Sequence, residues 1–182
     1  MIFLARLSRV LFISVFCLGL VVPAAAADTI YMNITSSKQG PIKGEGKAPH
    51  PGEWMPLISV SETATSPRDA ATGQASGKRQ HEPIKVVKEI GASSPQLQRA
   101  LTSGELLKEV VIEFYRPNGI GPAELCETIR LTDAMITSIQ NRGAVTAGKG
   151  SRPTDEISFA YEKIEITYTK GKTASDRLNK IN

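Results

Sequence analysis

Along most of this chain apolar residues alternate with polar ones, and they do so with the period of a β-strand. In the stretch TIYMNIT, the side chains of Ile30, Met32 and Ile34 would face one way. The same period predicts strands over Trp54–Ser61 and His81–Ile90, two or three more across Lys108–Arg116, AELCETIRL and TDAMITSIQ, and a last one over Ile157–Thr169. About seven strands separated by turn-forming residues favour a mainly β protein, an antiparallel β-barrel or sandwich.

The last predicted strand changes its apolar face halfway along. In a regular strand one face would carry Ile157, Phe159 and Tyr161, and the opposite face would carry Ile164, Ile166 and Tyr168. A β-bulge between Tyr161 and Ile164 would reset the phase, and a bend from one side of a barrel to another would explain the change as well. Burial of both faces, one of them against the helix or a second subunit, is the third explanation.

The stretch VVIEFY is apolar on both faces as well, with Val111 and Tyr115 opposite Val110, Ile112 and Phe114. One bulge does not explain two such strands, and one short helix cannot cover both outer faces of a small barrel. The pattern therefore predicts contact between subunits. The predicted interface residues are Val111, Tyr115, Ile164, Ile166 and Tyr168.

One short helix is predicted in SSPQLQRALTSG. Ser94 is a suitable N-cap, Pro95 suits the first helical position, and Gly104 suits the C-terminal stop. Its apolar stripe consists of Leu97, Ala100 and Leu101. A helix of about nine residues is not stable alone, so it must pack on the sheet.

Three segments lack periodicity and are predicted to be irregular. Ser36–Glu53 holds four glycines and three prolines, and Glu62–Gln80 is small, polar and 19 residues long. The C-terminal tail, Gly171–Asn182, is polar and is expected to be loose. The folded domain is expected to cover residues 28–170.

The first 27 residues have the order of a secretory signal peptide. Arg6 and Arg9 precede an uncharged run over Val10–Val22, and small residues then offer an A-x-A cleavage site. Cleavage after Ala27 leaves 155 residues, and the formal charge falls from +4 to +2. We expect a secreted or periplasmic protein that is not held in a membrane after cleavage.

A search for catalytic, cofactor or metal motifs yields none. GEGK (Gly44–Lys47) lacks the spacing and the Ser/Thr of a phosphate loop, and His50 and His81 have no partner ligands at metal-site spacing. Cys126 is expected to be a small, partly buried strand residue. The charge is too low for nucleic-acid binding. We predict a binding or structural protein without cofactor or metal, not an enzyme.

Five segments, taken in order, resemble the Hcp (haemolysin-coregulated protein) family of type VI secretion systems. They are IYMNI, WMPLISVS, KEIGASSPQLQRALTSGELLKEVVIEFYR, LCETIRLTDAMITSIQ and PTDEISFAYEKIEITYT. The most specific parts are Ser93-Ser94-Pro95 with Leu97, Ala100 and Gly104, and Lys163-Ile164-Glu165 with Tyr168.

The resemblance implies a small antiparallel β-barrel with one short flanking helix that assembles into hexameric rings. In that family the rings stack into a tube that is fired outward and carries effectors. The implied partners are other copies of the chain, secretion spike or sheath proteins, and small effector proteins. The long Glu62–Gln80 loop stands where the family has a ring-stacking loop, which implies a stacking role for Ser66, Pro67, Arg68 and Asp69.

The signal peptide departs from the family, whose members are loaded from the cytoplasm. Two functions therefore stay open: a ring or tube component, and a secreted monomeric β-barrel that binds a ligand or hydrolyses one.

Overall fold

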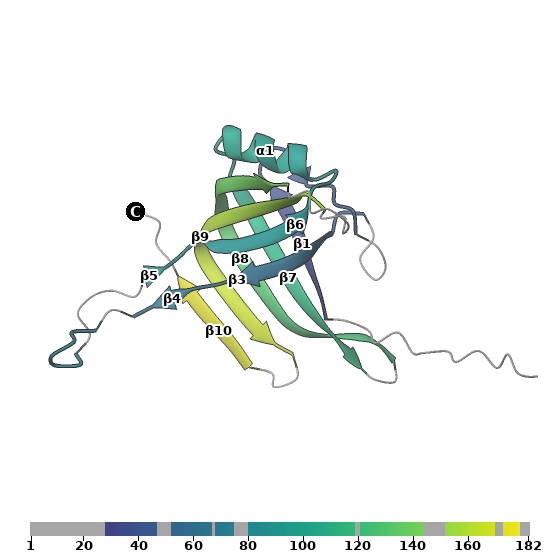
Figure 1. The fold of residues 1–182 in the computed structure, drawn as a ribbon. Helices are drawn as coiled ribbons and strands as arrows, with labels where there is room; N and C mark the ends of the chain where they lie inside the picture. Colours follow the sequence, from purple (N-terminus) through teal and green to yellow (C-terminus); the bar gives the residue numbers. More distant parts are fainter. Residues whose placement is uncertain are drawn as a thin grey trace, which may run out of the picture.

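The protein folds as a closed antiparallel barrel with a helix over one end (Figure 1). The computed structural model describes residues 28–46, 52–66, 68–74, 80–118, 121–143, 152–169 and 173–178. The barrel strands are β1 (Thr29–Ser36), β3 (Met55–Ser61), β6 (Ile84–Glu89), β7 (Leu107–Asn118), β8 (Gly121–Arg142) and β9 (Thr154–Tyr168). They run in the order β9-β6-β3-β1-β7-β8, and pairing of β8 with β9 closes the circle. The predicted barrel is confirmed.

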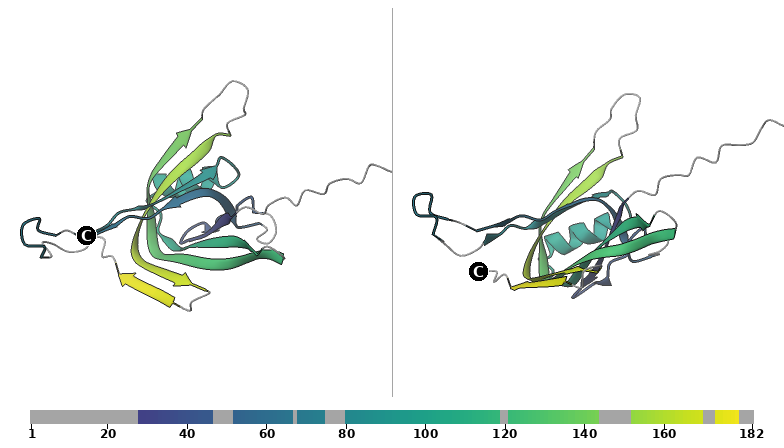
Figure 2. Two further views of the ribbon diagram at one scale, coloured as in Figure 1. Left: turned by 60° about the horizontal axis from the view of Figure 1, so that its bottom comes forward. Right: turned by 90° about the horizontal axis from the view of Figure 1, so that it is seen from below.

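The other elements lie outside this circle. β2 (Gly40–Pro41) pairs with β1, and β10 (Thr173–Leu178) pairs with β9. β4 (Ala64–Thr65) and β5 (Gln80–His81) pair with each other at the base of a projecting hairpin, which extends away from the barrel in Figure 1. Seen from below, α1 (Ser94–Thr102) lies across the far end of the barrel (Figure 2).

The helix is placed by its own sequence. Ser93, not Ser94, is the N-cap, and Pro95 lies in the first turn as predicted. Leu97 and Ala100 are each 1% exposed and pack into the barrel core. Gly104 follows the helix at φ +56°, a left-handed conformation that glycine adopts at helix ends without steric cost.

The face change in β9 is an irregularity that neighbouring strands share. The β8–β9 register is the same on both sides of Asp133 and Glu162, which are themselves unpaired in the ladder, and Asp133 has φ +49°. In β8 the alternation of buried and exposed side chains changes phase at this point. In β7 the same alternation changes phase on the neighbouring strand, at Lys108. Because several strands shift together, the side chains on either side of the irregularity still face the core.

Ile164 is therefore not on an outer face. It is 0% exposed and belongs to the same core as Phe159 and Tyr161, and Ile166 packs against that core. The expected bulge between Tyr161 and Ile164 does not occur as a register shift, since the shift in the β8–β9 ladder lies between Ile136 and Ser138. The change of face at Glu162 is shared with β8 instead.

One further expectation is corrected, because Thr173–Leu178 forms β10 instead of a loose tail. AELCETIRL and TDAMITSIQ lie in one long strand, β8. β3, which contains Pro56, has neighbours on both sides, and a register shift lies close to this proline, between Leu57 and Ser59. In the described part of the chain no helix has the length and apolarity needed to cross a membrane.

Candidate assembly surfaces

The outer face of β3, β1 and β7 carries an apolar patch that the helix does not cover. Pro56 and Tyr31 are register partners, and Tyr31 meets the ring of Tyr115 edge-on at a centroid distance of 6.0 Å. Ile58 is 56% exposed, the highest value among the large apolar side chains described. We call Tyr31, Pro56, Ile58 and Tyr115 the outer patch. Exposed apolar groups of this kind mark interaction sites when they are contiguous.

A shallow pocket of about 450 Å³ lies within this region. Its apolar wall includes Tyr31, Pro56, Leu57 and Ile58, and its polar wall includes Glu45, Glu89 and Arg152. The guanidinium of Arg152 bonds both carboxylate oxygens of Glu89, at 3.0 and 2.9 Å. The outer patch therefore has an apolar centre and a charged rim, the arrangement typical of protein interfaces.

Tyr115 is held in one orientation at the edge of the patch. Its hydroxyl donates to Glu113 Oε2 at 2.9 Å. Desolvation and this hydrogen bond to a carboxylate raise the pKa of Tyr115, so the ring stays neutral. A fixed, neutral aromatic side chain contributes contact area at little cost in conformational entropy.

Val111 lies on the same outer face but is only 8% exposed in the single chain. Its register partner is Arg130, which forms an ion pair with Glu109 and is itself the register partner of Glu165. A hydrogen bond from Lys163 lowers the pKa of Glu165. This part of the outer face is therefore a band of paired charges, and Val111 adds little open apolar area to it.

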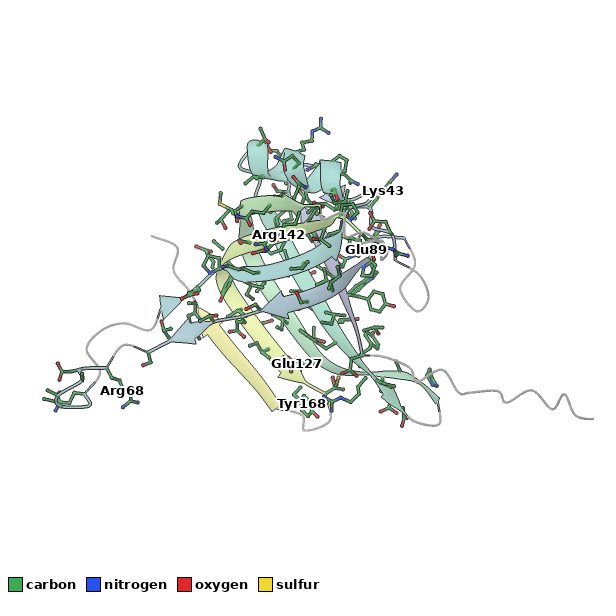
Figure 3. The ribbon with its side chains drawn as sticks, viewed as in Figure 1. Lys43, Arg68, Glu89, Glu127, Arg142 and Tyr168 are labelled. Atoms are coloured by element: carbon green, nitrogen blue, oxygen red, sulfur yellow. The ribbon has the colours of Figure 1, made fainter. Side chains whose placement is uncertain are left out.

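Ile166 and Tyr168 lie on the opposite side of the sheet from Val111. They continue the core face of Ile164 toward the open end of the barrel, where Glu127 pairs with both Tyr168 and Phe114. Figure 3 shows Glu127 and Tyr168 near this end, away from the helix. The five predicted interface residues thus lie in three places. Val111 and Tyr115 are on the outer face, Ile166 and Tyr168 lie toward the open end, and Ile164 is in the core.

The tip of the projecting hairpin has a defined conformation. Asp69 Oδ1 accepts hydrogen bonds from the backbone N–H groups of Ala71 (3.0 Å) and Thr72 (2.8 Å) and from the Thr72 hydroxyl (2.9 Å). The bonds from Thr72 and Ala71 lower the pKa of Asp69. Arg68 donates to the Gly73 carbonyl and lies far from the barrel in Figure 3. Ser66, Arg68 and Asp69 are exposed, and Pro67 lies outside the described residues.

A buried polar network joins the helix to the barrel. Lys88 Nζ lies 3.2 Å from Ser94 Oγ and 3.8 Å from Asp155 Oδ2, and both charged side chains are 1% exposed. The Ser94 hydroxyl and Asn141 Nδ2 donate to Asp155. Desolvation lowers the pKa of Lys88, and nearby carboxylates, Glu45 foremost, oppose that shift. The network therefore links the first turn of the helix to β6 and β9.

The described residues include no group of three or more His, Cys, Asp or Glu side chains that could hold a metal ion. Cys126 is 6% exposed, and its Sγ lies 3.1 Å from the Phe114 carbonyl oxygen, which fits the prediction of a buried strand residue. The features that stand out are therefore surfaces, and the fold defines a small β-barrel protein with an apolar outer patch and a projecting hairpin.

Comparison with known proteins identifies the family. The family model "Type VI secretion system effector, Hcp" matches residues 31–168, and the chain belongs to this family. It is similar to the "Major exported protein" of Pseudomonas aeruginosa PAO1, with 32% identity over 164 residues that cover 82% of this chain and 95% of the relative.

Two solved structures have the same fold. A crystal structure of an Hcp protein has 27% identity and a TM-score of 0.80, and the match covers 86% of this chain and all of the other. The secreted protein Hcp3 from Pseudomonas aeruginosa has 26% identity and a TM-score of 0.70, with 85% and 100% covered. The family resemblance of the sequence is confirmed.

Sequence reasoning missed three members of the outer patch, namely Tyr31, Pro56 and Ile58. In a regular strand Ile58 shares a face with Val60, yet the register shift after Leu57 leaves Val60 packed against the core and Ile58 exposed. Pro56 was the one signal of an irregularity there, and it did not show on which side Ile58 would lie.

Proposed function

We propose that this chain is an exported structural component of a type VI secretion tube, and that six copies close into a ring. The outer patch carries this proposal, because Ile58, Pro56 and Tyr31 form an apolar surface that the single helix leaves open. In a closed ring each copy uses two different surfaces, so the outer patch would contact another part of the neighbouring copy. Membership of the Hcp family supports a structural role in secretion.

The test is the native mass of the mature chain, residues 28–182, with Ile58→Asp as the variant. We expect the unaltered chain to be sixfold and Ile58→Asp to be monomeric with an unchanged circular dichroism spectrum, because a carboxylate in an apolar contact must be desolvated. Ile90→Asp is the matched control, since Ile90 is 44% exposed and does not line the pocket of the outer patch. It should remain sixfold.

A monomeric unaltered chain at high protein concentration would contradict the ring and would favour a secreted monomeric barrel. An Ile58→Asp variant that stays sixfold would contradict the assignment of the contact to the outer patch.

We also propose that the hairpin tip takes part in the stacking of rings and that the tube carries small effectors and meets spike or sheath proteins. The support is the preformed, exposed conformation of Ser66, Arg68 and Asp69. Asp69→Ala removes three hydrogen bonds from the tip, so rings should still form while tubes in negative-stain images become shorter. Glu82→Ala, beside the base of the hairpin, is the control. Tubes of unaltered length in Asp69→Ala would argue against this role.

The proposed export route uses cleavage of the first 27 residues. The "Major exported protein" relative supports secretion. The intact mass of the secreted chain tests the route, because cleavage after Ala27 leaves 155 residues. A secreted chain that keeps its leader would contradict it.

A further inference from the structure

β9 has one edge that is covered in two different ways. β8 pairs with β9 along its whole length on one side. On the other side β6 covers only Thr154–Phe159, and β10 covers Lys163–Tyr168 through six residue pairs. The second half of this edge therefore depends on the C-terminal strand for its pairing.

β10 can leave without opening the barrel. Closure depends on the β6–β9 and β8–β9 ladders, and β9 is the pairing partner that the structure gives for β10. The barrel is therefore closed without β10.

The two strands differ in how readily they would pair with another chain. The covered segment of β9 reads KIEITY, in which β-branched and aromatic residues predominate. Such a segment with free N–H and C=O groups is a template for pairing between chains. β10 reads TASDRL, which has as many charged residues as KIEITY but no aromatic residue and only one β-branched residue, Thr173, so its intrinsic preference for strand pairing is lower.

We propose that β10 is a cover for the Lys163–Tyr168 edge, and that without it this edge pairs antiparallel with the same edge of a second copy. β10 thereby prevents dimers that form through backbone hydrogen bonds between two β9 edges. Copies of the chain can then associate only through side-chain contacts. This inference does not depend on the ring, because the edge of β9 and the outer patch are separate features.

The experiment removes β10 in the Ile58→Asp background, in which the proposed ring contact is blocked. The mature chain ending at Thr169 is compared with the full mature chain and with a control ending at Leu178. Analytical ultracentrifugation over a concentration series should show dimers for the chain ending at Thr169, at least about tenfold tighter than for the two others. Hydrogen exchange should show the amides of 163–168 becoming protected as the dimer forms.

Ser175→Pro in the full chain is the second variant. Proline removes a ladder N–H and is excluded from paired strand interiors, so it should release β10 and give the same dimer. A truncated or Ser175→Pro chain that folds and stays monomeric at every concentration overturns the proposal. So does a dimer whose 163–168 amides exchange freely. If the Ile58→Asp chain still forms rings, the outer patch is not the ring contact. The proposal for β10 is then still tested by whether removing β10 adds further association.

Discussion

Glu105 is a buried carboxylate whose protonation should control the stability of the barrel end beneath the helix. It is 2% exposed and lies between the end of α1 and the start of β7. Its oxygens accept hydrogen bonds from the Ser36 hydroxyl, the Lys38 N–H (2.7 Å), the Gln39 N–H (2.9 Å) and Gln39 Nε2 (3.0 Å). These bonds connect the turn after β1 to the segment between α1 and β7.

The magnitude follows from the pKa of this carboxyl. Desolvation alone would raise it, but the hydrogen bonds from Ser36, Gln39 and Lys38 are stronger together and lower the pKa from its ordinary 4.5 to about 2. A carboxyl with this difference between unfolded and folded chain contributes about 3 kcal/mol to the free energy of unfolding at neutral pH. Because the folded pKa is the lower one, the contribution is complete above about pH 5 and is lost as the pH falls toward 2.

Glu105→Gln should therefore lower the free energy of unfolding by about 3 kcal/mol at neutral pH and by little near pH 2. The assay is urea unfolding of the mature chain across this pH range, followed by circular dichroism and the fluorescence of the single tryptophan, Trp54. Using the Ile58→Asp background for all samples keeps association from adding to the measured stability.

Glu82→Gln is the control for the loss of a charge, since Glu82 is exposed and should change stability by a few tenths of a kcal/mol at most. Two results would refute the reasoning. A Glu105→Gln variant as stable as the unaltered chain at neutral pH would show that the hydrogen bonds do not favour the charged form. If Glu105→Gln lowers the free energy of unfolding equally at low and neutral pH, the loss of stability comes from packing and not from the charge.

Three further predictions concern stability and can be read from thermal and urea unfolding followed by circular dichroism. Asp133→Gly should be neutral or stabilising, and Asp133→Val should cost about 2 kcal/mol, because φ at this position is +49°; equal stabilities would contradict this. Lys88→Met should cost about 3 kcal/mol by leaving Asp155 buried without its cation, and an unchanged midpoint would show that this ion pair does not stabilise the fold. Gly44→Ala should cost about 1–3 kcal/mol, since a Cβ would lie 2.2 Å from the Trp54 carbonyl oxygen; no loss would mean that the loop moves aside freely.

The regular parts of the fold were predictable because each depends on local chemistry. The two-residue period located every barrel strand, since one face of each is buried. Pro95 and Gly104 bounded the helix to within a residue, because each has a backbone preference that suits only one end of a helix. The sequence left open whether AELCETIRL and TDAMITSIQ form one strand or two. They form the single strand β8, and the Leu131–Thr132 junction between them carries no turn residue.

Buried charges could not be predicted, because their sequence context is that of exposed residues. Glu105 follows a helix-ending glycine, and lysine is a residue type that is rarely buried, so both read as solvent-facing positions even though the strand period puts Lys88 on the face of Ile84 and Val86. Their burial depends on partners far along the chain, such as Ser36 for Glu105 and Asp155 for Lys88. A single sequence does not show which distant polar groups will meet.

The irregularity at Asp133 and Glu162 changes which residues support assembly. The two-faced pattern of β9 pointed to a second subunit only if the strand were regular, and the structure places Ile164 in the core instead. In β3 a register shift after Leu57 leaves Ile58 exposed to solvent beside Tyr31 and Pro56. Backbone irregularities thus remove the apparent evidence on one strand and supply the exposed surface on another. Self-association should therefore be more sensitive to Ile58→Asp than to a charge at Val111, whose side chain is already covered in a single copy.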